Sequence, residues 1–309
     1  MLPGKVSEII RQAASASRFD LCGIARAEEL IPEGERLMSW LADGMNAGMD
    51  YMNRNTGKRI NPALLVPGAK TVVVVALNYY PGNSNHSESF PVISRYATGA
   101  DYHVVMKERL GEMMKRLQTL IPGLEGRVFT DSAPVMEKAL AVRAGLGSQG
   151  RNSLLIVRGR GSYFFLGELI INAVAEYDEP SSFDPCVGCS RCVDACPTAA
   201  ISAGGFLEAG RCISYLTVEH RGDMPSQFQG RLNNRVFGCD ICQDVCPHNS
   251  GSRKHSVPEF LLSEERMKMT QDDWEKLTPE KFVRLFRGST VERTGYDRFV
   301  RNLMFARTL

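Results

Sequence analysis

The sequence has no hydrophobic run long enough to cross a membrane. Its most apolar stretches, 71–77 and 163–171, are far shorter than the roughly 20 residues that a spanning helix needs. The N-terminus does not have the pattern of a signal peptide either, because Glu8 and Arg11 interrupt it within an amphipathic stretch. We therefore predict a protein of the reducing cytoplasm that does not associate with a membrane.

Net charge is also nearly absent. The chain has 37 Lys and Arg against 35 Asp and Glu, a balance of +2, which neither favours nor excludes a nucleic-acid partner. Residues 281–309 are more basic, with seven Lys and Arg against two acids, a local balance of +5. A surface that contacts phosphates and a solvated helix face both explain these charges. The seven residues are Lys281, Arg284, Arg287, Arg293, Arg298, Arg301 and Arg307.

A length of 309 residues with 43% apolar residues suggests about two domains. The acidic segment 176–185, rich in Pro and Ser, is typical of a linker. We predict a first domain over 1–175, a cysteine-rich domain over 176–252 and a charged, mostly helical tail over 253–309.

Hydrophobic periodicity predicts the main elements of the first domain. Helices are expected over 5–19, 102–120 and 134–144, and strands over 71–77, 127–130, 153–158 and 162–172. Ser132 is expected to cap the third helix, with Pro134 in its first turn and Gly145 after its end. Residues 159–161 are expected to form a hairpin turn between the last two strands.

Eight of the nine cysteines form two blocks. The first reads CxxCxxCxxxCP, and the second reads CxxCxxxCP with a detached cysteine upstream. This is the ligand pattern of two 4Fe–4S clusters, in which the last cysteine of each run crosses over to the other cluster. Structural zinc favours paired CxxC knuckles, and disulfides need an oxidising compartment, so both alternatives fit less well. The ninth, Cys22, lies in an apolar stretch and is expected to be an inert buried thiol.

The crossover assigns every ligand. One cluster is expected on Cys186, Cys189, Cys192 and Cys246, and the other on Cys196, Cys212, Cys239 and Cys242.

Residues 145–150 match the glycine pattern GxGxxG. A dinucleotide site requires a strand before this pattern and a helix after it, whereas here a helix is expected before it and a strand after it. We therefore reject a nicotinamide site. The glycines are expected to turn the chain or to let the backbone approach a flat group.

Two clusters deliver single electrons, and a bare ferredoxin would not carry a large α/β domain. The cluster domain is therefore expected to serve an active site in residues 1–175, which disfavours hydrolase chemistry.

Several segments together closely resemble epoxyqueuosine reductases, from near the N-terminus to about residue 305. They are SRYA (94–97), GADYH (99–103), FTDSAPVME (129–137), AGLG (144–147), NS (152–153), GSYFFLGE (161–168), RCISYLT (211–217) and NRVFGCD (234–240).

The resemblance implies an α+β protein, in which a nitroreductase-like cobalamin-binding α/β domain precedes a bacterial-type two-cluster 4Fe-4S ferredoxin domain. It implies reduction of epoxyqueuosine to queuosine in a tRNA anticodon stem-loop, with cobalamin as a cofactor and an external low-potential electron donor. The protein is expected to be a monomer. Many relatives continue into a helical-repeat domain, so a sequence that stops at Leu309 is expected to be a short form or a truncated record.

The resemblance also implies site residues. Asp131 matches the family's proton donor, a role that would require a raised pKa; a helix cap or a partner of a cation is the alternative. Lys138 and Arg143 are expected on a solvated helix face. Contacts to the corrinoid are implied for Arg59, Ser94, Asn152, Leu166, Ser214 and Asp240.

Some cobalamin proteins ligate cobalt with the His of an Asp-x-His-x-x-Gly motif. The chain has Asp101 and His103 at this spacing but Met106 in place of the glycine. We therefore expect that no side chain ligates cobalt through this motif, and that His103 is structural or lies near the substrate.

Two other functions remain open at this point. One is a corrinoid and iron–sulfur reductase for a small molecule, such as a dehalogenase, and the other is a non-catalytic electron carrier. Dehalogenases commonly carry an export signal, which is not evident here.

Overall fold

The structure is a computed structural model that describes residues 1–82 and 91–307. The last two residues of the predicted tail, 308 and 309, lie outside the described residues. No helix in the described part of the chain is long and apolar enough to cross a membrane.

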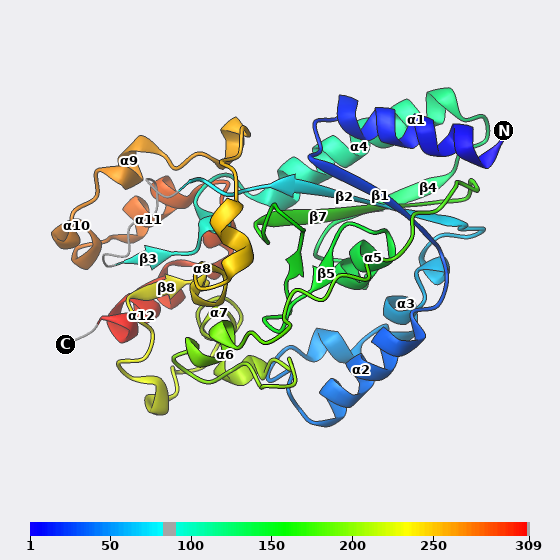
Figure 1. The fold of residues 1–309 in the computed structure, drawn as a ribbon. Coiled ribbons are helices and arrows are strands. Elements are labelled where there is room, and N and C mark those ends of the chain that lie inside the picture. Colours follow the sequence, from blue (N-terminus) through cyan, green and yellow to red (C-terminus); the bar gives the residue numbers. More distant parts are fainter. Residues whose placement is uncertain (83–90, 308–309) are drawn as a thin grey trace.

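A four-stranded antiparallel sheet forms the centre of the first half of the chain (Figure 1). Its strands lie in the order β1 (Leu21–Arg26), β2 (Thr71–Asn78), β7 (Phe164–Ile171) and β4 (Gly126–Phe129). The valine-rich strand β2 is buried along nearly its whole length, because both faces of the sheet are covered. The strands predicted over 71–77, 127–130 and 162–172 are confirmed.

Helices cover both faces of this sheet. Helices α1 (Pro3–Ala16) and α4 (Tyr102–Leu120) pack on one face, and α5 (Glu137–Arg143) packs on the other (Figure 1). Successive side chains of β2 point to opposite faces of the sheet, so this strand contributes to the hydrophobic core on each face. Val73 lies on the α1–α4 side and Val74 on the α5 side. The helices predicted over 5–19 and 102–120 are confirmed.

The start of α5 differs from its prediction. The helix begins at Glu137 rather than at Pro134, and Ser132 does not cap it, because the Ser132 hydroxyl donates to the carbonyl of Thr130 instead. Asp131 adopts a left-handed φ of +53°, which turns the chain before the helix can start. The predicted end is confirmed, since Gly145 follows the helix with a φ of +70°.

The predicted hairpin of 153–158 with 162–172 is only partly present. Strand β6 (Leu155–Ile156) pairs with β5 (Ser148–Gln149) in a separate small sheet, and a single bridge joins Val157 to Gly161. The GxGxxG segment therefore leads from α5 into β5, which agrees with the rejection of a dinucleotide fingerprint.

The second half of the chain consists of short elements. Strand β3 (Val92–Ile93) pairs in parallel with β8 (Arg235–Phe237) and so joins the two halves. The helices of the second half are α6 (Arg191–Asp194), α7 (Ile213–Val218), α8 (Ile241–Asp244), α9 (Glu264–Met267), α10 (Gln271–Glu275), α11 (Pro279–Phe286) and α12 (Tyr296–Ala306). Two more helices, α2 (Ile31–Ala42) and α3 (Thr56–Ile60), belong to the first half of the chain.

The helical tail shares its core with the cysteine-rich region. Phe286 and Phe299 of the tail form one buried cluster with Phe228 and Phe237. The side-chain amide of Asn302 donates to the carbonyls of Thr217 and Val236, at 2.8 and 2.9 Å. The tail is helical as predicted, but it is packed into the protein rather than appended to it.

Candidate active site

A cavity of about 780 Å³ opens between the α2–α3 region, the start of α5 and residues 205–207. Its lining includes Trp40, Tyr51, Arg59, Asp131, Lys138 and Arg293. Helix α2 is tied across the cavity, because the Trp40 indole donates to the Leu207 carbonyl at 2.6 Å and Arg36 donates to the Gly205 carbonyl at 2.7 Å. The two halves of the chain therefore enclose the cavity together.

Asp131 projects into this cavity from the turn after β4. Its side chain is 52% exposed, and its main-chain N–H donates to the carboxylate of Glu137. The preceding residue is fixed to the sheet, because the Thr130 hydroxyl donates to the Leu166 carbonyl at 2.9 Å. The sheet and the first residue of α5 thus place this carboxylate.

His103 lies between two carboxylates. Its Nε2 is 2.8 Å from Oδ2 of Asp131, and its Nδ1 is 2.6 Å from Oδ1 of Asp101. Asp101 is also the N-cap of α4, since it accepts the main-chain N–H of His103. The cap therefore orients the imidazole toward Asp131.

These contacts decide where the proton lies. Burial alone would lower the pKa of His103, but its hydrogen bonds to Asp101 and Asp131 outweigh burial and raise the pKa to about 9. Burial would raise the pKa of Asp131, but the hydrogen bond from His103 outweighs it and holds that pKa below the usual range. The raised pKa expected for Asp131 is thus wrong in this geometry, because at neutral pH the proton lies on His103.

The residues implied as corrinoid contacts do not all lie together. Arg59 lines the cavity, and its buried Nε has no hydrogen-bond partner among the described residues. The other five, Ser94, Asn152, Leu166, Ser214 and Asp240, are not among the residues that line this cavity. Ser94 and Asp240 hydrogen bond to each other, and Leu166 is part of the core beneath α5.

Two residues expected on a solvated face are engaged. Lys138 is exposed, as expected, but it lines the cavity rather than an open helix face. Arg143 forms a two-pronged ion pair with Glu33, at 2.9 and 3.0 Å. Helical periodicity identifies the outer face of α5, but not the α2–α3 region that covers it.

Most of the basic residues of the tail also have partners within the protein. Lys281 pairs with Asp273, Arg284 with Glu265 and Arg307 with Glu275. The guanidinium groups of Arg298 and Arg301 donate to main-chain carbonyls. Arg293 lines the cavity, so it is the one of these seven that the structure places at the candidate site.

No disulfide joins any of the nine cysteines, all of which lie in the described part of the chain. Burial is the largest cause that raises the pKa of Cys192, Cys212, Cys242 and Cys246, and neighbouring thiols raise it further. The larger of these mutual interactions form two sets. Cys192 and Cys246 interact with Cys186 and Cys189, whereas Cys212 interacts with Cys196, and Cys242 interacts with Cys239 and Cys212. A weaker interaction between Cys242 and Cys192 connects the two sets.

The two sets have the members that the crossover pattern assigns to two clusters. Among the described residues, no three His, Cys, Asp or Glu side chains converge as the ligands of a single metal ion would. A cubane does not require that convergence, because each cysteine binds a different iron.

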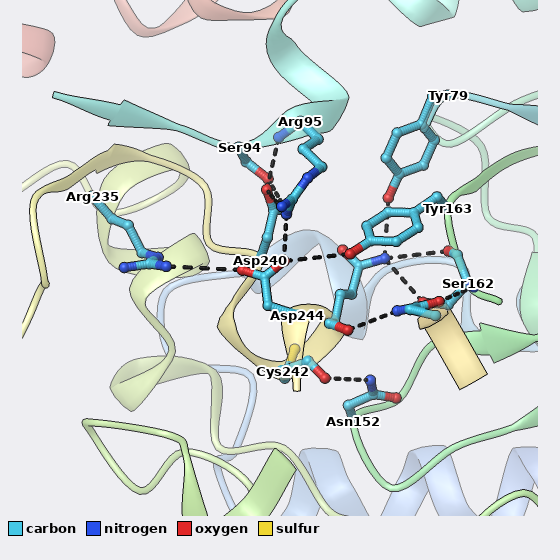
Figure 2. Close-up of polar contacts among 12 residues, drawn as sticks. Tyr79, Ser94, Arg95, Asn152, Ser162, Tyr163, Arg235, Asp240, Cys242 and Asp244 are labelled. Carbon is cyan, nitrogen blue, oxygen red and sulfur yellow. Dashed lines mark hydrogen bonds and ion pairs between the residues drawn. The ribbon is translucent and has the colours of Figure 1, made fainter. Parts of the chain in front are cut away.

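Helix α8, between the ligand candidates Cys239 and Cys246, is fastened to the first half of the chain by polar side chains (Figure 2). Asp240 accepts the hydroxyl of Ser94 and the main-chain N–H of Arg95, the latter at 2.8 Å. The Arg95 guanidinium contacts Asp240 at 3.3 Å and Asp244 at 2.5 Å. We call Ser94, Arg95, Asp240 and Asp244 the polar clamp.

Neighbouring contacts extend the polar clamp. Gln243 donates to the carbonyl and hydroxyl of Ser162, and Asn152 donates to the carbonyl of Cys242 at 3.4 Å (Figure 2). Gly238 has a φ of +70°, and a Cβ there would lie only 2.5 Å from Cβ of Ser94, so this approach requires glycine.

Known proteins resemble this chain over nearly its whole length. The family model described as "Epoxyqueuosine reductase QueG, DUF1730" matches residues 59–132, and the "4Fe-4S double cluster binding domain" model matches residues 185–249. The epoxyqueuosine reductase of Cyclobacterium marinum is 46% identical over 304 residues, which cover 98% of this chain and 97% of that relative. The chain belongs to the epoxyqueuosine reductase family.

Solved structures of epoxyqueuosine reductases share the whole fold. One, with a tRNA-Tyr epoxyqueuosine-modified stem loop, matches with a TM-score of 0.90 and 30% identity, covering 98% of this chain and 80% of its own. Another, from Bacillus subtilis, has its catalytic aspartate loop swung out of the active site. It matches with a TM-score of 0.88 and 30% identity, over 98% and 81% of the two chains.

More distantly, a reductive dehalogenase described as B12-dependent shares the fold, with a TM-score of 0.51 and 17% identity over 98% of this chain and 36% of its own. In this chain the α/β half precedes a double-cluster domain, which binds two iron–sulfur clusters.

Removing the charge of the polar clamp tests its importance in this epoxyqueuosine reductase. Arg95→Met should destabilise the protein by about 3–5 kcal/mol, because two largely buried carboxylates lose the cation that they share. Thermal unfolding and iron retention under a chelator measure the effect. The matched control is Arg26→Met, which breaks an exposed pair with Glu28 and should change stability by less than about 1 kcal/mol. Equal stability of the two variants would contradict the role of the clamp.

Proposed function

We propose that this chain reduces epoxyqueuosine to queuosine in tRNA, using electrons from two 4Fe–4S clusters and a bound cobalamin. The observation that carries the proposal is Asp131, which is hydrogen bonded to a protonated His103 and faces a cavity enclosed by the catalytic half and the cluster half. Family membership supports the same substrate. The enzyme is proposed to act in the cytoplasm, as a monomer, with an external low-potential electron donor.

The eight cysteines of the two sets are the proposed cluster ligands. Cys186, Cys189, Cys192 and Cys246 would hold the first cluster, and Cys196, Cys212, Cys239 and Cys242 the second. Both sets adjoin the segment 149–153 at the cavity wall, because the main-chain N–H of Arg151 donates to Cys186 and the side chain of Asn152 donates to the carbonyl of Cys242. Clusters held by these cysteines would supply single electrons to a cofactor in the cavity.

The residues around the cavity fit a corrinoid. The buried Nε of Arg59 is an unused donor that suits an amide or phosphate oxygen of such a cofactor. Cobalamin, when bound, supplies a strongly reducing cobalt centre for the two electrons. Arg59 is the cavity residue proposed to hold it. Ser94, Asn152, Leu166, Ser214 and Asp240 are proposed as contacts from the resemblance alone, since none of them lines the cavity.

The protein's own contribution is the supply of protons. Conversion of an epoxide to an alkene consumes two electrons and two protons and releases water, and the oxygen leaves poorly as an alkoxide. For the first proton, His103 passes its Nε2 proton to Oδ2 of Asp131 at 2.8 Å, and Asp131 delivers it to the departing oxygen. The second proton, which completes the water molecule, comes from solvent that reaches the half-exposed Asp131 carboxylate. Asp101 stabilises the charge on His103 before the transfer.

The rim of the cavity suits a tRNA loop. Arg36, Arg54 and Arg293 line it and can contact phosphates, and the half-exposed ring of Tyr51 can stack on a base. We propose that the anticodon stem-loop enters here and that the modified base reaches Asp131.

Metal analysis tests the cluster proposal. Anaerobically prepared protein should contain about eight irons per chain and no stoichiometric zinc. Cys212→Ser should lower the iron content to about half if the second cluster alone is lost. Stoichiometric zinc, or an iron content unchanged in Cys212→Ser, would contradict the assignment.

Asp131→Asn tests the proton donor. With cobalamin, a reductant and tRNA that carries epoxyqueuosine, turnover measured by nucleoside mass spectrometry should fall at least about a hundredfold, because an amide cannot deliver the proton. The electron paramagnetic resonance of the reduced clusters should be unchanged. Full turnover by the variant would remove Asp131 from the role.

The pH dependence tests His103. Because its pKa is raised to about 9, its proton is retained at neutral pH and lost as the pH rises through about 9. Turnover should fall over that range, and the stability contributed by the pair should fall with it. In His103→Gln this alkaline limb should disappear and neutral turnover should be low. An alkaline limb that persists in the variant would belong to another group.

A further inference from the structure

Glu168 is a carboxyl in the middle of an apolar strand. It lies in β7 with 0% of its surface exposed, between Leu166 and Ile170, which share its face of the sheet. Neither of its oxygens has a hydrogen-bond partner of ordinary geometry among the described residues. Burying a carboxyl without a hydrogen-bond partner lowers the stability of the folded state, so a role for Glu168 has to be sought.

The position of Glu168 in the sheet places it beneath the catalytic turn. It pairs with Phe129, the last residue of β4, two residues before Asp131. Helix α5 packs on this face of β7 and begins with Glu137. Side-chain hydrogen bonding with Glu137 is among the causes that raise the pKa of Glu168, so the two carboxyls are neighbours. Three carboxyls therefore gather where β4 ends and α5 begins.

Glu168, which is fully buried, and Glu137, which is half-buried at the cavity wall, share a proton. Burial, followed by the charges of Glu137 and Asp131, raises the pKa of Glu168 well above its ordinary value. Burial and the charge of Asp131 raise the pKa of Glu137 to about 7, whereas Lys138 and His103 oppose the increase. At neutral pH the proton of the pair therefore lies on Glu168.

Glu137 in turn holds the main chain of Asp131. Its Oε1 accepts the N–H of Asp131, which has the left-handed φ of +53°. That conformation is unfavourable for a residue with a Cβ, so it persists only if neighbouring groups stabilise it.

We propose that Glu168 is a positioning residue for the reaction: as a neutral acid it donates a hydrogen bond to Glu137, which thereby holds Asp131 turned toward the cavity. The inference rests on the proposed role of Asp131 in catalysis. It assigns a task to a buried carboxyl that never touches the substrate.

Two substitutions separate this role from simple core packing. Glu168→Gln keeps a donor to Glu137, whereas Glu168→Met keeps the shape without a donor. Amide hydrogen exchange at Asp131, followed by mass spectrometry in the cluster-loaded protein, should be at least about tenfold faster in Glu168→Met and within about threefold of the parent in Glu168→Gln. The matched control, Glu125→Met at an exposed position before β4, should not change it.

Turnover should follow the same order, with normal iron content in every variant. Two results would overturn the proposal. In one, the amide of Asp131 exchanges no faster in Glu168→Met than in the parent protein. In the other, it exchanges as fast in Glu168→Gln as in Glu168→Met. If the exchange rates change as predicted but turnover does not, Glu168 does position Asp131, and the proposed catalytic role of Asp131 is wrong.

An infrared measurement keeps the proposal testable if Glu168→Met does not fold. The parent protein at neutral pH should show the C=O stretch of a protonated carboxyl that shifts in D₂O, and Glu168→Gln should lack it. Absence of that band in the parent would overturn the proposal.

Discussion

The arrangement of the whole molecule depends on the ion pairs that Arg95 makes with Asp240 and Asp244. Arg95 belongs to the α/β half, and the two carboxylates flank the short helix that carries Cys242. Only 10% of the Arg95 side chain and 3% of the Asp240 side chain are exposed, so these charges satisfy each other inside the protein rather than at its surface. A reaction that joins electrons from one half to protons from the other requires that the halves keep a fixed distance, and this contact fixes it.

The proton side is built on the same rule, that buried charge must be balanced locally. His103 is cationic because Asp101 and Asp131 lie on either side of it, and Asp131 is anionic because His103 is cationic. Beneath them, Glu137 and Glu168 lie in a less polar region and keep one proton between them. The neighbourhood thus holds several carboxyls in different protonation states. The hydrogen bonds from His103 keep Asp101 and Asp131 ionised, whereas burial and the neighbouring carboxylates raise the pKa values of Glu137 and Glu168.

Sequence patterns predicted what depends on neighbours along the chain. The helix over 102–120 and the buried strand at 71–77 follow from local periodicity, and the structure agrees with both. The cysteine spacing predicted a two-cluster domain, which the family model over residues 185–249 supports. The contact of His103 with Asp131 could not be predicted in this way, because it joins the start of α4 to the turn after β4 across 28 residues. Two further differences also depend on contacts outside the helix. Helix α5 starts late because the Glu137 carboxylate accepts the main-chain N–H of Asp131, and Lys138 lies in the cavity because the α2–α3 region covers that face of the helix.

The position of α8 has a consequence for the lifetime of the protein in air. Within eight residues this helix and its flanks bring Cys239 and Cys242 to one set of thiols and Cys246 to the other. A displacement of the segment at one end is transmitted directly to the other end. Oxidative loss of one cluster would therefore disturb the ligand that this segment supplies to the other, so the remaining cluster is expected to degrade faster in air than it does in the intact protein.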